Sequence, residues 1–347
     1  MREDETSHKP PDALHPLWLT SQERNQDMDE QGFRAMLQTR KASDEQIDAA
    51  LALVERFEAF AADAGGVLSA EMAWAFSEQL IREGQNTEDN YLALARYGLF
   101  TGNNTLFVAI LELLDGAEAQ GNLYRRVADL FGTTVRDEVF AGIGVAPLGL
   151  PTPAKPRMMH PVIERLEARV GEQACRALLA DSLRDLPDET YLQEQRRYQE
   201  ANGLDEYLRR KKRAFVGQLE TCQREGRLFF AQEITDEVIA FVNDDPEIGG
   251  GRREGRIIYE TKIPFMTTRY LAETDPILKR YYYCHCPWAR EAIKNGDVTL
   301  MATFCQCSAG FHKKPWEAAL KRPVQVQVLE SALKGDLRCR FAIYAVD

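Results

Sequence analysis

The sequence predicts an α+β protein: a helical N-terminal region followed by a small antiparallel-sheet α+β domain. Two observations lead to this prediction. Apolar residues recur with the helical period over 41–248, whereas from residue 249 onward the period shifts toward two, as in half-buried strands. The net charge changes at nearly the same point, from −17 before Gly251 to +6 from Gly251 onward. This asymmetry indicates two regions with different roles.

Composition narrows the class of protein. The 347 residues are 44% hydrophobic, which is enough apolar material for one large core or two ordinary ones. The first 40 residues predict a mobile tail, because they begin with charge and proline and lack the apolar stretch of a secretory signal. No run of about 18 apolar residues occurs, and the overall charge of −11 is acidic. We therefore expect neither a membrane nor nucleic acid as a partner.

The helical region, 41–248, begins with an amphipathic helix over 43–66, which has Ser43 as its N-cap candidate and ends at two glycines. The same pattern of cap, periodic apolar face and stop recurs over 69–84, 87–103, 105–116 and 123–132. A stretch rich in proline and glycine then predicts a long ordered loop or linker over 141–161. Helices are predicted to resume over 160–187, 189–203, 204–226 and 234–245.

The α+β domain, 249–347, begins at a glycine-rich break that we interpret as a linker. Its strands are predicted over 256–265, 297–305, 324–333 and 337–346, and its short helices over 286–296 and 313–322. Lys334-Gly335-Asp336 predicts a hairpin turn between the last two strands.

Cysteine is the most informative residue type in this domain. The chain has seven cysteines, an odd number, and four of them form two C-x-C pairs, which favours a reducing compartment and hence the cytoplasm. Thiolate and imidazole are preferred ligands of zinc, which takes four in a structural site. Zinc is therefore the leading interpretation, each C-x-C pair supplying one or two ligands. The candidate metal ligands are Cys284, His285, Cys286, Cys305, Cys307, His312 and Cys339.

Three other interpretations of these cysteines stay open. One is an iron–sulfur cluster on the four C-x-C thiols. Another is redox chemistry, because thiols at a helix start such as Cys286-Pro287 have lowered pKa values. The third is simple packing in a small core. Packing is our assignment for Cys175 and Cys222, which are isolated on predicted helices.

Aromatic and basic residues flank the candidate metal ligands. Aromatic side chains line small-molecule pockets, and a guanidinium attracts an anionic group, although both residue types also serve as core filler or as a solvated face. The leading prediction is a protein that binds a small, partly aromatic or anionic molecule beside a cysteine-ligated zinc. A second copy of the chain is a further candidate partner. The candidate ligand-binding residues are Tyr282, Trp288, Phe311, Trp316 and Arg290.

The C-terminal segment carries a recognisable order of residues: Cys307 and Gly310, Glu330, Gly335-Asp336, and Cys339-Arg340-Phe341. This order resembles the vinyl reductase type of small-molecule-binding domain and the C-terminal part of the 2-aminothiazoline-4-carboxylate hydrolase family. The helical region, together with the Cys-His-Cys-Pro-Trp motif, looks like uncharacterised bacterial proteins with the same ending.

In sensor proteins with the vinyl reductase type of domain, the resemblance implies a structural zinc held by a Cys, an acid with a second Cys, and a last Cys. The last Cys matches Cys339 and the first matches Cys307 or Cys305. The middle Cys falls on Ser331 and the acid falls near Val328, out of register with Glu330, so that zinc set is not intact. Our own hypothesis is that Cys284, Cys286 or a histidine substitutes.

The hydrolase resemblance gives an alternative function. In a hydrolase similar to the thiazoline family, a metal-bound water or Cys307 would attack a C=N or amide-like carbon, and Glu330 would assist proton transfer. Cys307 and Glu330 are therefore the candidate catalytic residues.

Overall fold

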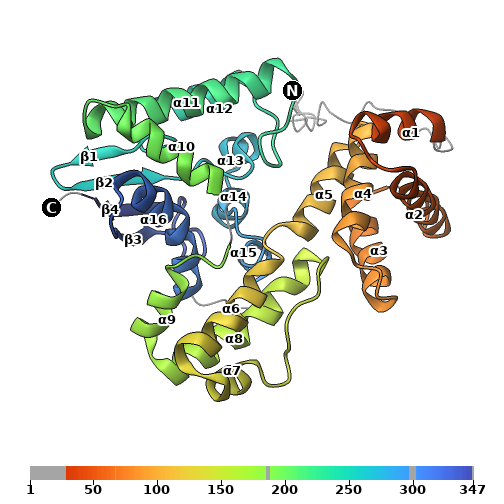
Figure 1. Ribbon diagram of the computed structural model, residues 1–347, viewed down its shortest axis with the longest axis horizontal. Coiled ribbons are helices and arrows are strands. Elements are labelled where there is room, and N and C mark those ends of the chain that lie inside the picture. Colours follow the sequence, from red (N-terminus) through yellow and green to blue (C-terminus); the bar gives the residue numbers. More distant parts are fainter. Residues whose placement is uncertain (1–28, 67, 185–187, 297–301, 346–347) are drawn as a thin grey trace, which may run out of the picture. The chain divides into compact units, whose positions relative to one another are not determined.

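The computed structural model describes residues 29–66, 68–184, 188–296 and 302–345 (Figure 1). It confirms the predicted fold class, since helices dominate and the C-terminal region holds a small four-stranded antiparallel sheet. The chain forms two compact units, 1–66 and 67–347. Among the described residues, no helix has the length and apolar character needed to cross a membrane.

The first unit contains α1 (Glu30–Thr39) and α2 (Asp44–Asp63). The predicted start of α2 is confirmed, because Ser43 and Gln46 form a capping box. The predicted tail over 1–40 is too long: Asp29 caps α1, whose Phe33 and Leu37 are buried one turn apart. Residues 1–28 of the predicted tail lie outside the described residues.

The second unit holds the other elements, in the order α3 (Ala70–Arg82), α4 (Glu88–Phe100), α5 (Asn104–Leu114), α6 (Glu118–Phe131), α7 (Thr133–Phe140), η1 (Thr152–Ala154), α8 (Lys155–Val170), α9 (Glu172–Leu179), α10 (Asp188–Gln199), α11 (Leu204–Arg224), α12 (Asp236–Asp244), β1 (Arg252–Glu254), β2 (Ile257–Thr261), α13 (Thr267–Ala272), α14 (Pro276–Tyr283), α15 (Arg290–Asn295), η2 (Ala302–Cys305), α16 (Gln306–Leu320), β3 (Gln325–Glu330) and β4 (Arg340–Tyr344).

The segment rich in proline and glycine is shorter than predicted. Helix α8 already begins at Lys155, so that Pro156 lies in its first turn and Pro161 lies inside it. Gly171, at φ 85°, separates α8 from α9 where one helix was predicted over 160–187. The remaining irregular backbone is held by buried polar side chains of α3 and α6 and by a half-buried side chain of the α3–α4 connection. These contacts are Ser77 Oγ to Gly149 O at 2.6 Å, Asn86 Nδ2 to Leu148 O at 3.0 Å, and Ala146 N to Gln120 Oε1 at 2.6 Å.

The C-terminal end of α5 is capped from distant parts of the chain. The fully buried Lys155 donates from Nζ to the carbonyl oxygens of Glu112 and Asp115, at 2.7 and 3.3 Å. Trp288 donates from Nε1 to the carbonyl oxygen of Gly116 at 2.8 Å. These contacts satisfy carbonyl groups that a helix end leaves without intrahelical partners. Burial lowers the pKa of Lys155 to about 8.

One hydrophobic core joins the helical region to the cysteine-rich region. It contains Leu123 of α6, Leu166 of α8 and Leu179 of α9 together with Cys284 and Cys307. The predicted boundary near residue 249 is therefore a change in secondary structure and not the edge of a core. The physical reason is that the apolar faces of α6, α8 and α9 are buried partly against residues that follow this boundary.

The sheet has strand order β1-β2-β4-β3, with every neighbouring pair antiparallel. Helix α16 packs on one face, where its Trp316 and Ala319 share a core with Ile258, Phe341 and Ile343. The glycine-rich break contributes the short strand β1 and is more than a linker.

Two local predictions around α16 differ from the structure. Of the strand predicted over 297–305, residues 302–305 form the 3-10 helix η2, and 297–301 lie outside the described residues. Helix α16 begins at Gln306, earlier than the predicted 313.

Gly310 of α16 makes a close approach that a larger residue would block. A Cβ atom there would stand 2.4 Å from the backbone nitrogen of Ser182. We expect Gly310→Ala to lower the free energy of unfolding by about 1 to 3 kcal/mol through overpacking. Gly217→Ala in α11 is the matched control, because a Cβ there meets nothing within 4 Å, and it should add about 0.4 to 1 kcal/mol. Urea unfolding of both variants measures the difference, and equal effects would contradict the packing argument.

Candidate functional site

Five cysteines from three segments converge beside the shared core, and we call them the thiol cluster. Cys284 directly follows α14 as its C-cap, and Cys286 lies in the connection to α15. Cys305 and Cys307 lie where η2 passes into α16, and Cys339 precedes β4. Cys284 and Cys307 are buried, and the other three are half-buried.

The thiols of this cluster affect one another's pKa values. Burial raises the pKa of Cys284, and the neighbouring sulfurs of Cys286, Cys339 and Cys305 raise it further. Burial also raises the pKa of Cys305, with Cys339 and Cys286 adding to the effect. The pKa of Cys286 rises to about 11, through burial first and Cys307 second. The thiols are therefore protonated at neutral pH when no cation compensates them, unlike the low-pKa thiols of a redox nucleophile.

Hydrogen-bond donors face several of the sulfurs. Leu183 N donates to Cys307 Sγ at 3.3 Å, and Ala332 N donates to Cys339 Sγ at 3.5 Å. Backbone hydrogen bonds also lower the pKa values of Cys284 and Cys286, from the N–H groups of Cys286 and Trp288 respectively. Donors of this kind stabilise a thiolate and are the outer-shell contacts that metal-ligating side chains use.

The donor set of the thiol cluster fits a soft or borderline metal ion. As the side chains stand, no three His, Cys, Asp or Glu groups in the described part of the chain are placed to hold a metal ion. Each cysteine reaches its other staggered rotamers by rotation about one bond. The cysteines therefore suit a metal ion by their chemistry. Their sulfurs would have to rotate in this way to converge on the ion.

The two histidines predicted as metal ligands have other partners. His285 Nε2 lies 2.6 Å from the carbonyl oxygen of Ile263, and burial lowers the pKa of its imidazole to about 3. His312 Nδ1 lies 2.5 Å from Glu260 Oε2, and its ring stacks on Phe341 at 4.0 Å. Both imidazoles are therefore neutral at pH 7.

Glu260 is the centre of a buried polar group that sequence reasoning missed. Its carboxylate accepts from Lys211 Nζ at 2.6 Å and from Trp316 Nε1 at 3.0 Å, as well as from His312. Burial alone would raise the pKa of Glu260, but the charge of Lys211 and the His312 hydrogen bond lower it to about 2. The sequence did contain a signal for this residue. In the alternating pattern of β2, Glu260 is a charged residue on the same face of the strand as the buried Ile258.

Lys262 and two serines near the thiols were also missed. Lys262 Nζ donates to Ser308 Oγ at 2.5 Å, and its charge lowers the pKa values of Cys305, Cys307 and Cys339 against the larger effect of burial. Ser331 donates from Oγ to Cys305 Sγ at 3.2 Å. Ser331, which stands where the resemblance implies the middle Cys, is thus in contact with the thiol cluster.

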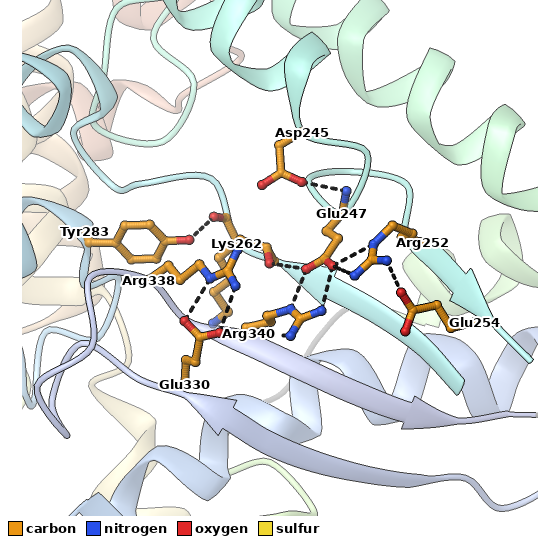
Figure 2. A network of polar contacts seen from close by, with 10 residues as sticks. Asp245, Glu247, Arg252, Glu254, Lys262, Tyr283, Glu330, Arg338 and Arg340 are labelled. Carbon is orange, nitrogen blue, oxygen red and sulfur yellow. Dashed lines mark hydrogen bonds and ion pairs between the residues drawn. The ribbon is translucent and has the colours of Figure 1, made fainter. Parts of the chain in front are cut away.

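The predicted catalytic pair, Cys307 and Glu330, has two different sets of partners. Cys307 accepts from Leu183 as described above. Figure 2 shows Glu330 in a polar network on another part of the sheet, where Arg338 donates two hydrogen bonds to it, both at 2.8 Å. The Arg338 hydrogen bonds lower the pKa of Glu330, so this carboxyl is ionised at neutral pH and poorly suited to donate a proton.

Three of the five predicted ligand-binding residues are buried in the fold. Trp288 and Trp316 donate to Gly116 and Glu260, and Arg290 pairs with Glu112 at 2.6 Å. Phe311 is half-buried, with the Arg184 guanidinium and the Lys262 ammonium over its ring. Tyr282 is half-buried beside Arg269.

The polar network in Figure 2 supports a prediction on acid stability. Burial would raise the pKa of Glu247, but hydrogen bonds from Arg340, Thr261 and Arg252 lower it from 4.5 to about 2. Because the pKa is lower in the folded state, the stabilisation is present above about pH 4.5 and is lost as the pH falls toward 2. We expect Glu247→Gln to lower the free energy of unfolding by about 2 kcal/mol at pH 7 and to have little effect near pH 2.

Urea unfolding at several pH values measures this effect. A loss of stability that is as large at pH 2.5 as at pH 7 would contradict the assignment. Glu330→Gln serves as the control, because its carboxylate is about one-third exposed and its contribution is smaller.

Comparison with known proteins gives one partial match. Residues 267–347 match DUF6144, a family of unknown function. No curated protein and no solved structure matches the chain. The matched stretch contains the whole thiol cluster and begins after Glu260 and Lys262, and the description of the family gives no activity.

Proposed function

We propose that the protein binds a metal ion, zinc in the first place, through the thiol cluster, and that this centre supports small-molecule binding by the C-terminal region. The observation that carries the proposal is the proximity of five cysteines from three segments, most of which pack in or against one core and whose thiols interact electrostatically. Thiolates concentrated in this way are the ligand type that zinc and related ions select. We also propose that the protein resides in the cytoplasm, where free thiols persist.

Four of the five thiols form the proposed ligand set: Cys284, Cys286, Cys305 and Cys339. The pKa of Cys284 responds to the other three members, and the pKa of Cys305 responds to Cys339 and Cys286. Cys307 affects the pKa of Cys286 but not those of Cys284 and Cys305, so we place it outside the set. A tetrahedral site closed by four protein ligands is typical of structural zinc.

Charge around the thiol cluster favours thiolates. The charge of Lys262 acts on Cys305 and Cys339, and that of Arg184 acts on Cys286. Metal binding deprotonates the coordinating thiols, and nearby cations reduce the cost of collecting that negative charge.

The test is the metal content of the full chain, purified without added metal and measured by plasma mass spectrometry. We expect about one zinc per chain, lost in Cys284→Ser, Cys286→Ser, Cys305→Ser and Cys339→Ser. Cys307→Ser and Cys222→Ser are the matched controls and should keep the metal. The free thiols are counted on the same samples after denaturation.

Each other outcome would replace the proposal. Iron with visible absorption would identify an iron–sulfur cluster. No metal with fewer than seven free thiols would favour thiol redox chemistry. No metal with all seven thiols free would leave the cysteines as packing residues.

A further inference from the structure

The side of α16 that faces β2 carries a row of polar residues between the sheet core and the thiol cluster. Ser308 and His312 stand one helical turn apart and project from the same side of the helix. Opposite them, Glu260 lies in β2, and Lys262 is the first residue after this strand. Because side chains alternate along a strand, both residues face α16. The contacts agree, since Lys262 reaches Ser308 and Glu260 reaches His312.

His312 has one nitrogen without a partner. Its Nε2 is buried and makes no hydrogen bond within the described residues. The ionised Glu260 carboxylate accepts the Nδ1 proton, which leaves the Nε2 lone pair as an acceptor. A buried acceptor left unpaired costs about 1 to 3 kcal/mol, so a partner for this nitrogen, such as a bound group, would be stabilising.

The other end of the row supplies donors. The Lys262 ammonium has three N–H groups, and its bond to Ser308 uses one of them. Lys262 and Ser308 are both half-buried, so this end of the row is in contact with solvent whereas Nε2 of His312 is not. A cation therefore stands at one end of the row, and an imidazole acceptor backed by a carboxylate stands at the other.

We propose that this row binds a neutral ligand whose edge presents a carbonyl oxygen beside an N–H group, as a cyclic or primary amide does. Lys262 and Ser308 donate to the carbonyl oxygen, and His312 Nε2 accepts the N–H. The dipole of such a group is aligned with the charges of the row. An anion would be repelled by Glu260, and a cation would be repelled by Lys262. The proposal rests on the small-molecule binding proposed above and names its ligand class.

Nuclear magnetic resonance of the full chain labelled with ¹⁵N-histidine tests this site directly. The probes are 2-pyrrolidinone and N-methyl-2-pyrrolidinone, which share the carbonyl group and differ in the N–H. The Nε2 signal of His312 is identified by its loss in His312→Gln. We expect it to report an unprotonated nitrogen that shifts saturably with 2-pyrrolidinone, at an affinity about tenfold higher than for the N-methyl probe. Lys262→Met should weaken the binding of both probes.

Equal affinity for the two probes, no shift with either, or a protonated Nε2 in the free protein would overturn the proposal. The metal content is measured on the same sample. A lactam response without bound metal would refute the metal centre and support this site. Bound metal without a lactam response would refute this site alone.

Discussion

Removing the metal from the thiol cluster is expected to lower the melting temperature of the unit formed by residues 67–347 by about 10 °C or more. The ion would tie together the end of α14, the start of α16 and the start of β4, so its binding free energy becomes folding free energy. A loss of about 5 kcal/mol gives a shift of this size at about 2 °C per kcal/mol, the lower end of the range for units of about 150 to 250 residues, because this unit is somewhat larger. Calorimetry before and after chelation measures it.

Two variants give this prediction its controls. Cys305→Ser removes a proposed ligand and should already melt near the temperature of the chelated protein, with no further response to chelator. Cys307→Ser keeps the four proposed ligands and should respond as the unmodified chain does. A melting temperature unchanged by chelation would argue against any structural metal ion.

Replacing Glu112 by Gln is expected to lower the free energy of unfolding by about 3 to 5 kcal/mol. Arg290 is almost fully buried, and its guanidinium lies 2.6 Å from the Glu112 carboxylate. The same guanidinium stands over the rings of Phe265 and Tyr281, at 4.5 and 5.4 Å. Without the carboxylate, the buried guanidinium would lose the ion-pair partner that the described residues give it, which is the costly way to break an ion pair.

The double variant Glu112→Leu with Arg290→Met separates charge from packing. It removes both charges and should recover most of the loss, because apolar residues of similar size replace a buried pair at little cost. Glu118→Gln, at a partly exposed pair with Arg184, is the surface control and should cost at most about 1 kcal/mol. Urea unfolding at pH 7 measures these free energies. A Glu112→Gln variant that is as stable as the unmodified chain would contradict the prediction.

The fold class and most helices could be predicted from local pattern. The capping box at Ser43 marks the start of α2, because cap and period agree there. Pattern was insufficient where distant contacts decide. Pro156 and Pro161 suggested a loop, but both lie in α8, whose first residue Lys155 is fixed by carbonyl groups at the end of α5.

The candidate site was predictable in its residue types and not in its arrangement. The sequence pointed to Cys284, Cys286, Cys305, Cys307 and Cys339, whose thiols interact in the structure, although no three ligand groups among the described residues are placed to hold a metal ion. The sequence could not show that His285 and His312 have other partners, because the groups that they contact lie in β2 and just after it. For the same reason Arg290 was assigned to a ligand, although the carboxylate that neutralises it lies in α5.

The irregular segment between α7 and α8 limits where recombination can divide this protein. Its backbone is bonded to Ser77, Asn86 and Gln120 of earlier elements, and the helices that follow it share a core with the cysteines. Recombination at this segment would leave buried polar groups unpaired on both sides of the join. The helices from α3 onward and the cysteine-bearing region therefore have to be passed on together, as a unit that does not divide into exchangeable modules.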